Sequence, residues 1–315
     1  MTAAVAIALY NGEKFIEKQL DSIRLQTVQP DQVILCDDGS KDDTIRIVSE
    51  YIQKYELDSQ WKLSVNSENL GYARNFYHAM SQCSADVIFL SDQDDIWKLD
   101  KIEKMMAVMQ AHSQITVLSC KHGVIDSEDQ PIHGLLSPKA KESLSLNCIA
   151  MENIMRSYRW PGMCLCIRKS LFDTLIPYIR DLTTPHDVVL TVCAADQGGF
   201  WEYGYIGADH RRHTNNAGQE EHRIRKVLNL ERKLREISFY NEMLTNLLSG
   251  KLQLSSDTEK VIRCRLVLSQ GRKDALEHRS LKGLYKVYYG EGSKMLRTFS
   301  LMCDIWLILF GMYKK

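Results

Sequence analysis

The chain has 315 residues, 44% hydrophobic and 25% charged, the composition of an ordinary soluble globular protein with one large domain or two. Lysine plus arginine and aspartate plus glutamate number 40 each, so no overall positive charge indicates nucleic acid as a partner. The nine cysteines are odd in number and scattered, which favours a reducing cytoplasmic compartment over a disulfide-bonded scaffold. The start shows no signal-peptide pattern, and no apolar run reaches the roughly 18 to 20 residues that a membrane span requires.

Strand-like and helix-like segments alternate in the first half of the chain. Short apolar runs predict strands, and apolar residues at three- and four-residue spacing predict helices. Strands are expected at 5–10, 32–36, 61–65, 86–90 and 115–119, and helices at 15–23, 44–55, 72–82 and 98–112. This alternation predicts βαβ units, and therefore an α/β fold with a mostly parallel sheet flanked by helices.

Polar residues follow each of the first four expected strands. Asn11 follows the first, residues 37–40 the second, residues 66–69 the third and residues 92–95 the fourth. Because ligands bind outside the carboxyl ends of parallel strands, these four loops are expected to form one binding site.

The acidic turn after the fourth strand, Ser91-Asp92-Gln93-Asp94-Asp95-Ile96-Trp97, is the most informative segment. A solvated acidic loop is the simpler interpretation, but the apolar run at 87–90 and the following Ile96-Trp97 favour carboxylates that hold a cation. Mg²⁺ and Mn²⁺ take oxygen ligands and often accompany phosphates. A D-x-D turn can place two carboxylates on such an ion, so Asp92 and Asp94 are the predicted metal ligands.

Two further turns complete a candidate nucleotide site. Asp38 could accept a hydrogen bond from a base or a ribose, and Gly39 would let the backbone approach a ligand. The alternative for this segment is a plain turn with a helix cap. Arg74, in the turn that leads into a helix, could lie near a diphosphate or be a surface residue.

The ordered set Tyr10-Asn11-Gly12, Asp38-Gly39-Ser40, Asn69-Leu70-Gly71 and the acidic turn resembles the family 2 glycosyltransferases with the GT-A fold. The S-D-Q-D-D-x-W form resembles the rhamnosyltransferase-like branch that builds bacterial cell-surface polysaccharides. The resemblance covers roughly residues 4–218. It implies that Tyr10 and Asp38 line the nucleotide-base pocket and that Asp94 is the most direct metal ligand. Asn11, Gly39 and Arg74 are further candidate donor-binding residues.

Two downstream segments extend the resemblance. Pro185-His186-Asp187-Val188-Val189 resembles the branch's H-D-W-W segment, which implies that Asp187 is the catalytic base. The alternative for Asp187 is a carboxylate stabilised by a helix N-terminus. The segment at 210–216 resembles Y-R-x-H-x-x-N with His210 in place of tyrosine, which implies that Arg211 and His213 stabilise the leaving diphosphate; an exposed basic loop is the alternative. A further segment, Trp160-Pro161-Gly162-Met163, resembles the turn near the acceptor, which implies that Gly162 permits close approach of the sugar.

The composition changes after Gly218, where charged residues alternate with leucine and isoleucine at helical spacing. We therefore expect a domain at 1–218 and a helical region at 219–315. The apolar run at 305–312 is too short to span a membrane and has basic residues around it. It is predicted to contact a membrane surface, and the alternative is a helix docked on this chain or on a second subunit.

The resemblance implies an inverting glycosyltransferase that uses Mg²⁺ or Mn²⁺. The expected donor is dTDP-rhamnose, with UDP-hexoses as the alternative, and the acceptor is a glycan or lipid-linked saccharide of O-antigen or capsule synthesis. The expected location is the inner face of the cytoplasmic membrane. A nucleotidyltransferase would show a glycine-rich basic loop at residues 11–14, which is absent. A non-catalytic assembly partner with the same fold would be expected to lack the D-x-D or the base, and both are present.

Overall fold

The computed structural model of the chain describes residues 1–132, 141–213, 229–290, 295–296 and 298–310. The chain forms two compact units: Met1–Ile149 with Trp160–Arg212, and Ala150–Arg159 with His213–Lys315. The expected boundary at residue 218 lies outside the described residues. The short segment Ala150–Arg159 belongs to the second unit although it lies within the first in sequence, which no composition change indicates.

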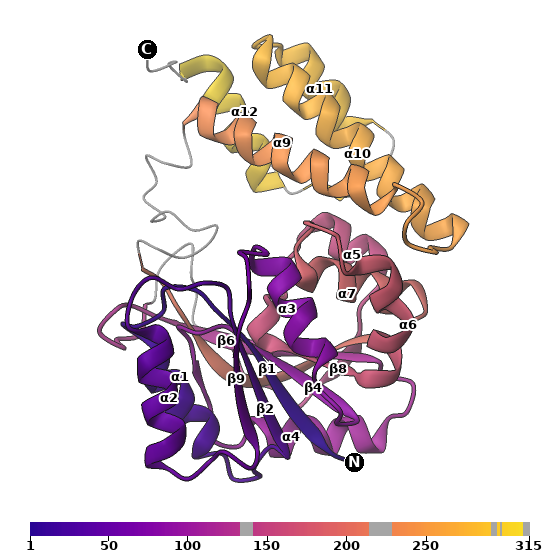
Figure 1. The fold of residues 1–315 in the computed structure, drawn as a ribbon. Coiled ribbons are helices and arrows are strands. Elements are labelled where there is room, and N and C mark those ends of the chain that lie inside the picture. The colour runs from indigo at the N-terminus through magenta and orange to yellow at the C-terminus, as the bar shows by residue number, and fades with distance from the viewer. Residues whose placement is uncertain (133–140, 214–228, 291–294, 297, 311–315) are drawn as a thin grey trace. The chain divides into compact units, whose positions relative to one another are not determined.

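The first unit is built on one sheet (Figure 1). The strand order is β3 (Trp61–Val65), β2 (Gln32–Asp37), β1 (Ala3–Leu9), β4 (Val87–Ser91), β8 (Leu165–Arg168), β6 (Val117–Ile125), β9 (Phe200–Arg211) and β5 (Ile96–Trp97). Strand β7 (Leu146–Cys148) also pairs with β9. The first four strands in this order are parallel, as expected. Strand β8 is antiparallel to both β4 and β6, so the sheet as a whole is mixed.

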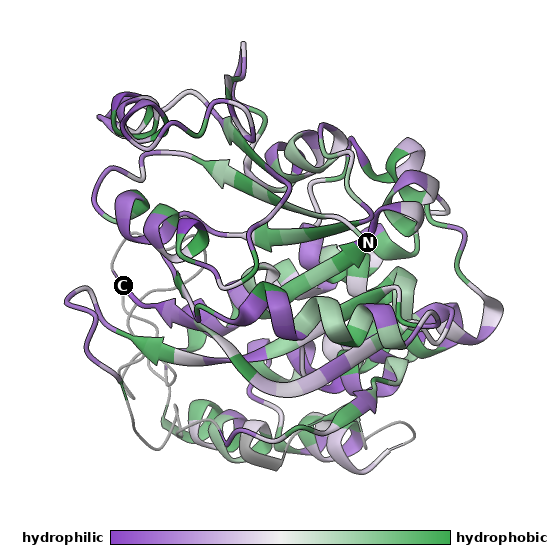
Figure 2. Ribbon diagram, turned by 90° about the horizontal axis from the view of Figure 1, so that it is seen from below, coloured by the Kyte–Doolittle hydropathy of each residue, from purple (hydrophilic) through white to green (hydrophobic). Residues whose placement is uncertain are grey.

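Strands β1 and β4 are buried along almost their whole length, which explains their continuous apolar runs. Figure 2, in which hydrophobic residues are green, shows the strands at the centre of the sheet largely in green. The polar loops begin where the buried apolar runs end, so the lengths of these strands determine where the loops lie at the edge of the sheet.

Helices flank the sheet on both sides. They are α1 (Ile16–Arg24), α2 (Thr44–Lys54), α3 (Tyr72–Ser81), α4 (Lys101–Ala111), α6 (Lys169–Ile179) and α7 (His186–Asp196), with a 3₁₀ turn, η1, at Gly162–Cys164. Figure 1 shows α1 and α2 side by side, and α3, α6 and α7 grouped together elsewhere on the sheet. The four helices expected before residue 115 are confirmed within a few residues. Helix α6 is an addition that the sequence did not suggest, because Pro177 lies inside it.

The second unit is helical. It contains α5 (Met151–Arg156), α9 (Leu230–Leu247), α10 (Ser256–Glu277), α11 (Leu281–Tyr289) and α12 (Thr298–Phe310). Side chains of Asn229, Ser255 and Ser280 accept hydrogen bonds from backbone N–H groups in the first turns of α9, α10 and α11. Helices α9 to α12 lie in the region after Gly218 where the sequence predicts helices. In the part of the chain that the structure describes, no helix is both long and apolar enough to cross a membrane.

A buried ion pair joins three helices of the second unit. Asp304 of α12 has no exposed surface, and it accepts hydrogen bonds from Nη2 of Arg272 on α10, at 2.8 Å, and from Nε of the same side chain. The hydroxyl of Tyr288 on α11 donates to the same carboxylate at 2.9 Å. The single aspartate that interrupts the C-terminal apolar run therefore determines which side of α12 faces the interior.

We expect Asp304→Ala to destabilise the second unit by about 3 to 5 kcal/mol, because it leaves the Arg272 charge buried without its partner. Urea unfolding followed by circular dichroism measures this free energy. The matched control is the double variant Arg272→Met with Asp304→Leu, which removes both charges and is expected to cost less. An equal cost for the single and double variants would contradict this account.

Candidate functional site

The loops that follow β1, β2 and β4 lie together at one edge of the sheet. The parallel register pairs Leu9 with Asp37 and Ile7 with Ser91, so these strands end at a similar level. The Gln93 side chain donates to the carbonyl of Tyr10 at 2.9 Å and accepts from its N–H at 2.9 Å. The loop after β1 is thus tied directly to the acidic turn after β4.

A second set of contacts ties the loop after β1 to the loop after β2. Asn11 donates its backbone N–H to the Ser40 hydroxyl at 2.9 Å, and its side-chain oxygen accepts from the N–H of Lys41 at 2.8 Å. Asn11 has a positive φ of 49°, which asparagine tolerates better than most residues. The Tyr10 side chain is half exposed and is available to a ligand. The structure therefore brings Tyr10 and Asn11 to the predicted edge.

Asp38 is buried and holds the loop after β3. Its carboxylate accepts from the N–H groups of Leu70 and Gly71 at 2.7 and 2.9 Å, and from the amide of Asn66 at 2.9 Å. A carboxylate has about four acceptor positions, so three of them are used within the protein. Gly39 has a positive φ of 84° with open space beside its Cα, an arrangement that leaves the backbone accessible.

The acidic turn gathers three carboxylates that repel one another. Desolvation, together with the charges of Asp95 and Asp94, raises the pKa of Asp92 well above its ordinary value. Asp95 has no exposed surface; its Oδ1 accepts from the N–H of Arg211 at 2.8 Å and lies 3.2 Å from Nδ1 of His210. Its Oδ2 is buried and has no hydrogen-bond partner within the described residues. These features fit a cation at the turn.

His210 responds to the same charges. Burial alone would lower the pKa of its imidazole, but Asp95, and after it Asp92 and Asp94, raise it above its ordinary value. Among the described residues, no group of three or more histidine, cysteine, aspartate or glutamate side chains is arranged to hold a metal by itself. A divalent ion at Asp92 and Asp94 would complete its coordination with water and phosphate oxygens, which is the usual arrangement for Mg²⁺.

Arg211 is buried beside the acidic turn. Its side chain is fully buried, its Nε donates to the Asp94 carbonyl at 2.7 Å, and its Nη1 donates to the Asp126 carbonyl at 2.8 Å. It also forms an ion pair with Asp129 and lies over the Phe15 ring at 4.6 Å. Arg211 therefore supports the acidic turn from within the protein. No local sequence pattern indicates this burial.

Arg74 and His213, the other two side chains predicted to lie near a diphosphate, belong to different units of the chain. Arg74 lies on α3, and its Nη2 donates to the carbonyl of Asp181, in the segment before α7, at 3.3 Å. Its Nε is buried and without a hydrogen-bond partner within the described residues. The first unit ends at Arg212, and His213 belongs to the second unit.

Asp187 lies in the first turn of α7 and is partly buried. The pKa of Tyr72 is raised by burial, then by the charge of Asp187 and then by that of Asp92. Asp187 also contributes to the raised pKa of Asp92. The predicted base and the predicted metal ligands therefore lie within electrostatic reach of each other, with Tyr72 near both.

His186 supports the helix turn that carries Asp187. Its ring is buried, stacks on Phe76 with 3.9 Å between ring centroids, and makes no hydrogen bond through either nitrogen within the described residues. A Cβ at Gly162 would lie 2.6 Å from Nε2 of His186. The glycine is thus required for packing against His186, a reason that differs from the predicted approach of a sugar. Burial lowers the pKa of His186 to about 3, so the ring is neutral at physiological pH.

We expect His186→Phe to remove an acid sensitivity of the fold. The imidazole binds a proton in the unfolded chain below pH 6.5 but not in the folded protein until about pH 3, so stability falls as pH falls through this window. The slope is about 1.4 kcal/mol per pH unit for one such group. Urea unfolding at about pH 7.5 and 5.5 measures it. The same pH dependence in wild type and variant would show that His186 is not desolvated.

We expect Asp92→Asn to stabilise the metal-free protein at neutral pH. The raised pKa means that the ionised carboxylate costs stability once the pH exceeds its value in the unfolded chain. The gain is about 1.4 kcal/mol for each unit by which the pKa is raised. Thermal or urea unfolding in the presence of a chelator measures it, with Asp58→Asn as a control for an exposed carboxylate. No gain relative to that control would contradict the crowding of charges.

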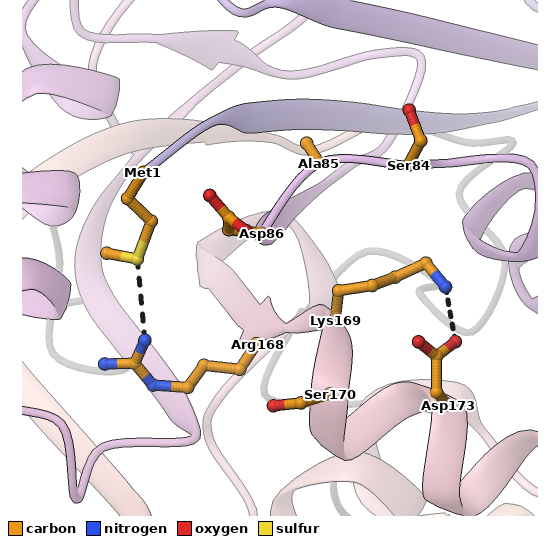
Figure 3. A pocket seen from close by; sticks show the side chains of 8 residues that line it. All are labelled: Met1, Ser84, Ala85, Asp86, Arg168, Lys169, Ser170 and Asp173. Carbon is orange, nitrogen blue, oxygen red and sulfur yellow. Dashed lines mark hydrogen bonds and ion pairs between the residues drawn. The ribbon is translucent and has the colours of Figure 1, made fainter.

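A cavity of about 520 Å³ lies at the other end of the sheet, beside the start of β1 and β4 (Figure 3). Its two cations are already engaged: Lys169 pairs with Asp173, and Arg168 donates to the carbonyls of Ile115 and Met109. Ligand binding in parallel sheets occurs at the carboxyl ends of the strands. We therefore assign the candidate site to the carboxyl ends of β1, β2 and β4, which we call the carboxylate edge, and not to this cavity.

The family model described as Glycosyl transferase family 2 matches residues 4–174. The chain is 31% identical to EpsE of Bacillus subtilis over 123 residues, which are 39% of this chain and 44% of EpsE. It is 39% identical over 100 residues to the dTDP-rhamnosyl transferase RfbG of Shigella flexneri, covering 31% of this chain and 34% of RfbG.

A third relative is an Escherichia coli protein named UDP-Gal:alpha-D-GlcNAc-diphosphoundecaprenol beta-1,3-galactosyltransferase. It is 30% identical over 115 residues, which are 36% of this chain and 41% of that protein. The matched stretches span less than half the length of each of these three relatives.

Two solved structures show the same fold. Staphylococcus aureus TarS 1–349 with UDP-GlcNAc has a TM-score of 0.61 at 16% identity, covering 100% of this chain and 93% of that one. The mannosyltransferase PcManGT of Pyrobaculum calidifontis, in complex with GDP-Man and Mn²⁺, has a TM-score of 0.56 at 14% identity, covering 97% and 84%. The α/β architecture with a central sheet flanked by helices is thereby confirmed.

Proposed function

Because the chain belongs to glycosyl transferase family 2, we propose that it is an inverting transferase whose donor site is the carboxylate edge at β1, β2 and β4. The observation that carries the proposal is the set of hydrogen bonds that ties the loops after β1, β2, β3 and β4 into one site. The charge of Asp187 also acts on Asp92 of that site. One end of the site has crowded acids that fit a cation and a diphosphate. The other end has a single carboxylate at a helix N-terminus, suited to accept a proton.

In the proposed reaction, the nucleotide part of the donor binds along Tyr10, Asn11, Asp38 and Gly39. A Mg²⁺ or Mn²⁺ ion held by Asp92 and Asp94 would offset charge on the departing diphosphate, and the printed description of PcManGT with Mn²⁺ supports this choice of ion. Arg74 is placed beside the same phosphates in this proposal.

Asp187 then accepts the proton of an acceptor hydroxyl. The hydroxyl oxygen forms the new bond to the anomeric carbon while the bond from that carbon to the diphosphate oxygen breaks. One displacement inverts the anomeric centre and releases a nucleoside diphosphate. The N-terminal dipole of α7 favours the ionised form of Asp187, which is the form that can take the proton.

We favour dTDP-rhamnose as the donor, with UDP-hexoses as the alternative. The partial likeness to RfbG supports the first, and the printed names of the galactosyltransferase and of TarS with UDP-GlcNAc support the second. The acceptor is proposed to be a glycan or a lipid-linked saccharide of cell-surface polysaccharide synthesis, such as O-antigen or capsule, at the inner face of the cytoplasmic membrane. The diphosphoundecaprenol in the name of one relative supports a lipid-linked acceptor.

We expect Asp94→Ala and Asp187→Asn each to abolish transfer while the protein stays folded. Loss of a general base typically costs about 10² to 10⁴ in rate. The assay measures nucleoside diphosphate release from a panel of nucleotide sugars with Mg²⁺, Mn²⁺ or a chelator. Asp58→Asn serves as the matched control, because that carboxylate is exposed and outside the site.

Two results would overturn the assignment. Full activity in either variant would remove that residue from the proposed chemistry. Nucleotide-sugar binding by the wild type without any release, across the whole panel and with either metal, would favour a non-catalytic partner that retains the fold.

A further inference from the structure

Helix α12 has a buried side and, opposite it, an apolar side that is exposed in the part of the chain that the structure describes. Leu307 and Ile308 are buried in the core of the second unit, on the same side as Asp304. The outward residues are all apolar and between 37% and 65% exposed: Met302, Ile305, Trp306, Leu309 and Phe310. Their spacing of three and four residues makes them one continuous stripe along the helix.

Helix α11 adds a second stripe in the same unit. Leu281, Tyr285 and Tyr289 are exposed at four-residue spacing, and the two tyrosine rings stack with 4.8 Å between centroids. Lys282 and Lys286 are exposed one position further along the helix. Leu284 and Tyr288 of α11 are buried in the same core cluster as the inner side of α12, so both stripes point away from one shared core.

We propose that the exposed apolar stripe of α12, together with that of α11, binds the surface of an anionic phospholipid bilayer. Contiguous exposed apolar surface marks an interaction site, whereas single exposed apolar residues are normal. Tryptophan and tyrosine favour the membrane interface, and lysines beside them are attracted to anionic headgroups. This complementarity of charge and composition is what identifies the occupant.

The geometry favours a helix that lies in the plane of the interface. Helix α12 has 13 residues, a length of about 20 Å, which is shorter than the roughly 30 Å of a bilayer's hydrocarbon core. Asp304 would oppose contact with lipid if it faced outward. Its burial against Arg272 and Tyr288 instead leaves the outward stripe without a carboxylate among the described residues.

The inference deepens the proposed function, because a protein held at a bilayer surface meets lipid-linked acceptors there. Only the link to lipid-linked acceptors rests on the proposed function, because binding to lipid itself needs no catalysis. The sequence predicted membrane contact for the run at 305–312, of which residues 311–312 lie outside the described residues. To this prediction the structure adds the exposed residues of α11, and it shows which side of α12 is exposed.

The test is co-flotation of the full chain with vesicles of phosphatidylcholine alone, or with about 30% phosphatidylglycerol. We expect the wild type to partition about tenfold or more in favour of the anionic vesicles. Trp306→Ser with Phe310→Ser should lose binding to both vesicle types. Lys282→Glu with Lys286→Glu should lose the preference for anionic lipid. Phe239→Ser, at an exposed aromatic of α9, is the matched control and should bind as the wild type does.

Several results would overturn the inference. They are absence of binding by the wild type, unchanged binding in either double variant, or a concentration-dependent dimer that the Trp306 and Phe310 changes abolish without any vesicle binding. The lysine variant changes only exposed charges, so it tests the inference even if the aromatic variant unfolds. Asp187→Asn should bind vesicles as the wild type does, which separates failure of this inference from failure of the proposed chemistry.

Discussion

The arrangement of the first unit depends on keeping three carboxylates together at the end of a buried strand. Desolvation, and after it repulsion from Asp95 and Asp94, raises the pKa of Asp92 and opposes folding with that carboxylate ionised. The protein offsets it with polar contacts from β9, where the backbone N–H of Arg211 meets Asp95 and its guanidinium meets the Asp94 carbonyl. Groups with strongly shifted pKa values are common at functional sites, and this turn is where the proposed function places a cation.

This arrangement explains which parts of the site could be predicted from sequence. Apolar runs locate β1, β2 and β4, and turn residues after them locate the loops, because both signals are local. The residues that hold the loops in place are not marked in this way. Gln93 and Arg211 act through contacts with residues distant in sequence, and an isolated glutamine or arginine carries no pattern that distinguishes support from ligand binding.

The fold shows the same limit. A strand buried on both faces is apolar at every position, so its composition does not reveal its direction, and the antiparallel placement of β8 could not be foreseen. Helix α6 was missed because proline normally ends a helix, although Pro177 lies in its last turn. The sequence marks His186 only as the neighbour of Asp187. Its burial against Phe76 and Gly162 comes from tertiary packing, which no local pattern indicates.

The double hydrogen bond between Gln93 and the backbone of Tyr10 has a mechanical consequence. The side-chain amide bonds both the N–H and the carbonyl of Tyr10, the residue that directly follows β1. It therefore holds the backbone after β1 against the acidic turn that follows β4. Gln93 stands between Asp92 and Asp94, so these two hydrogen bonds restrain the backbone that carries both acids. A restrained site loses less conformational freedom when it binds a ligand.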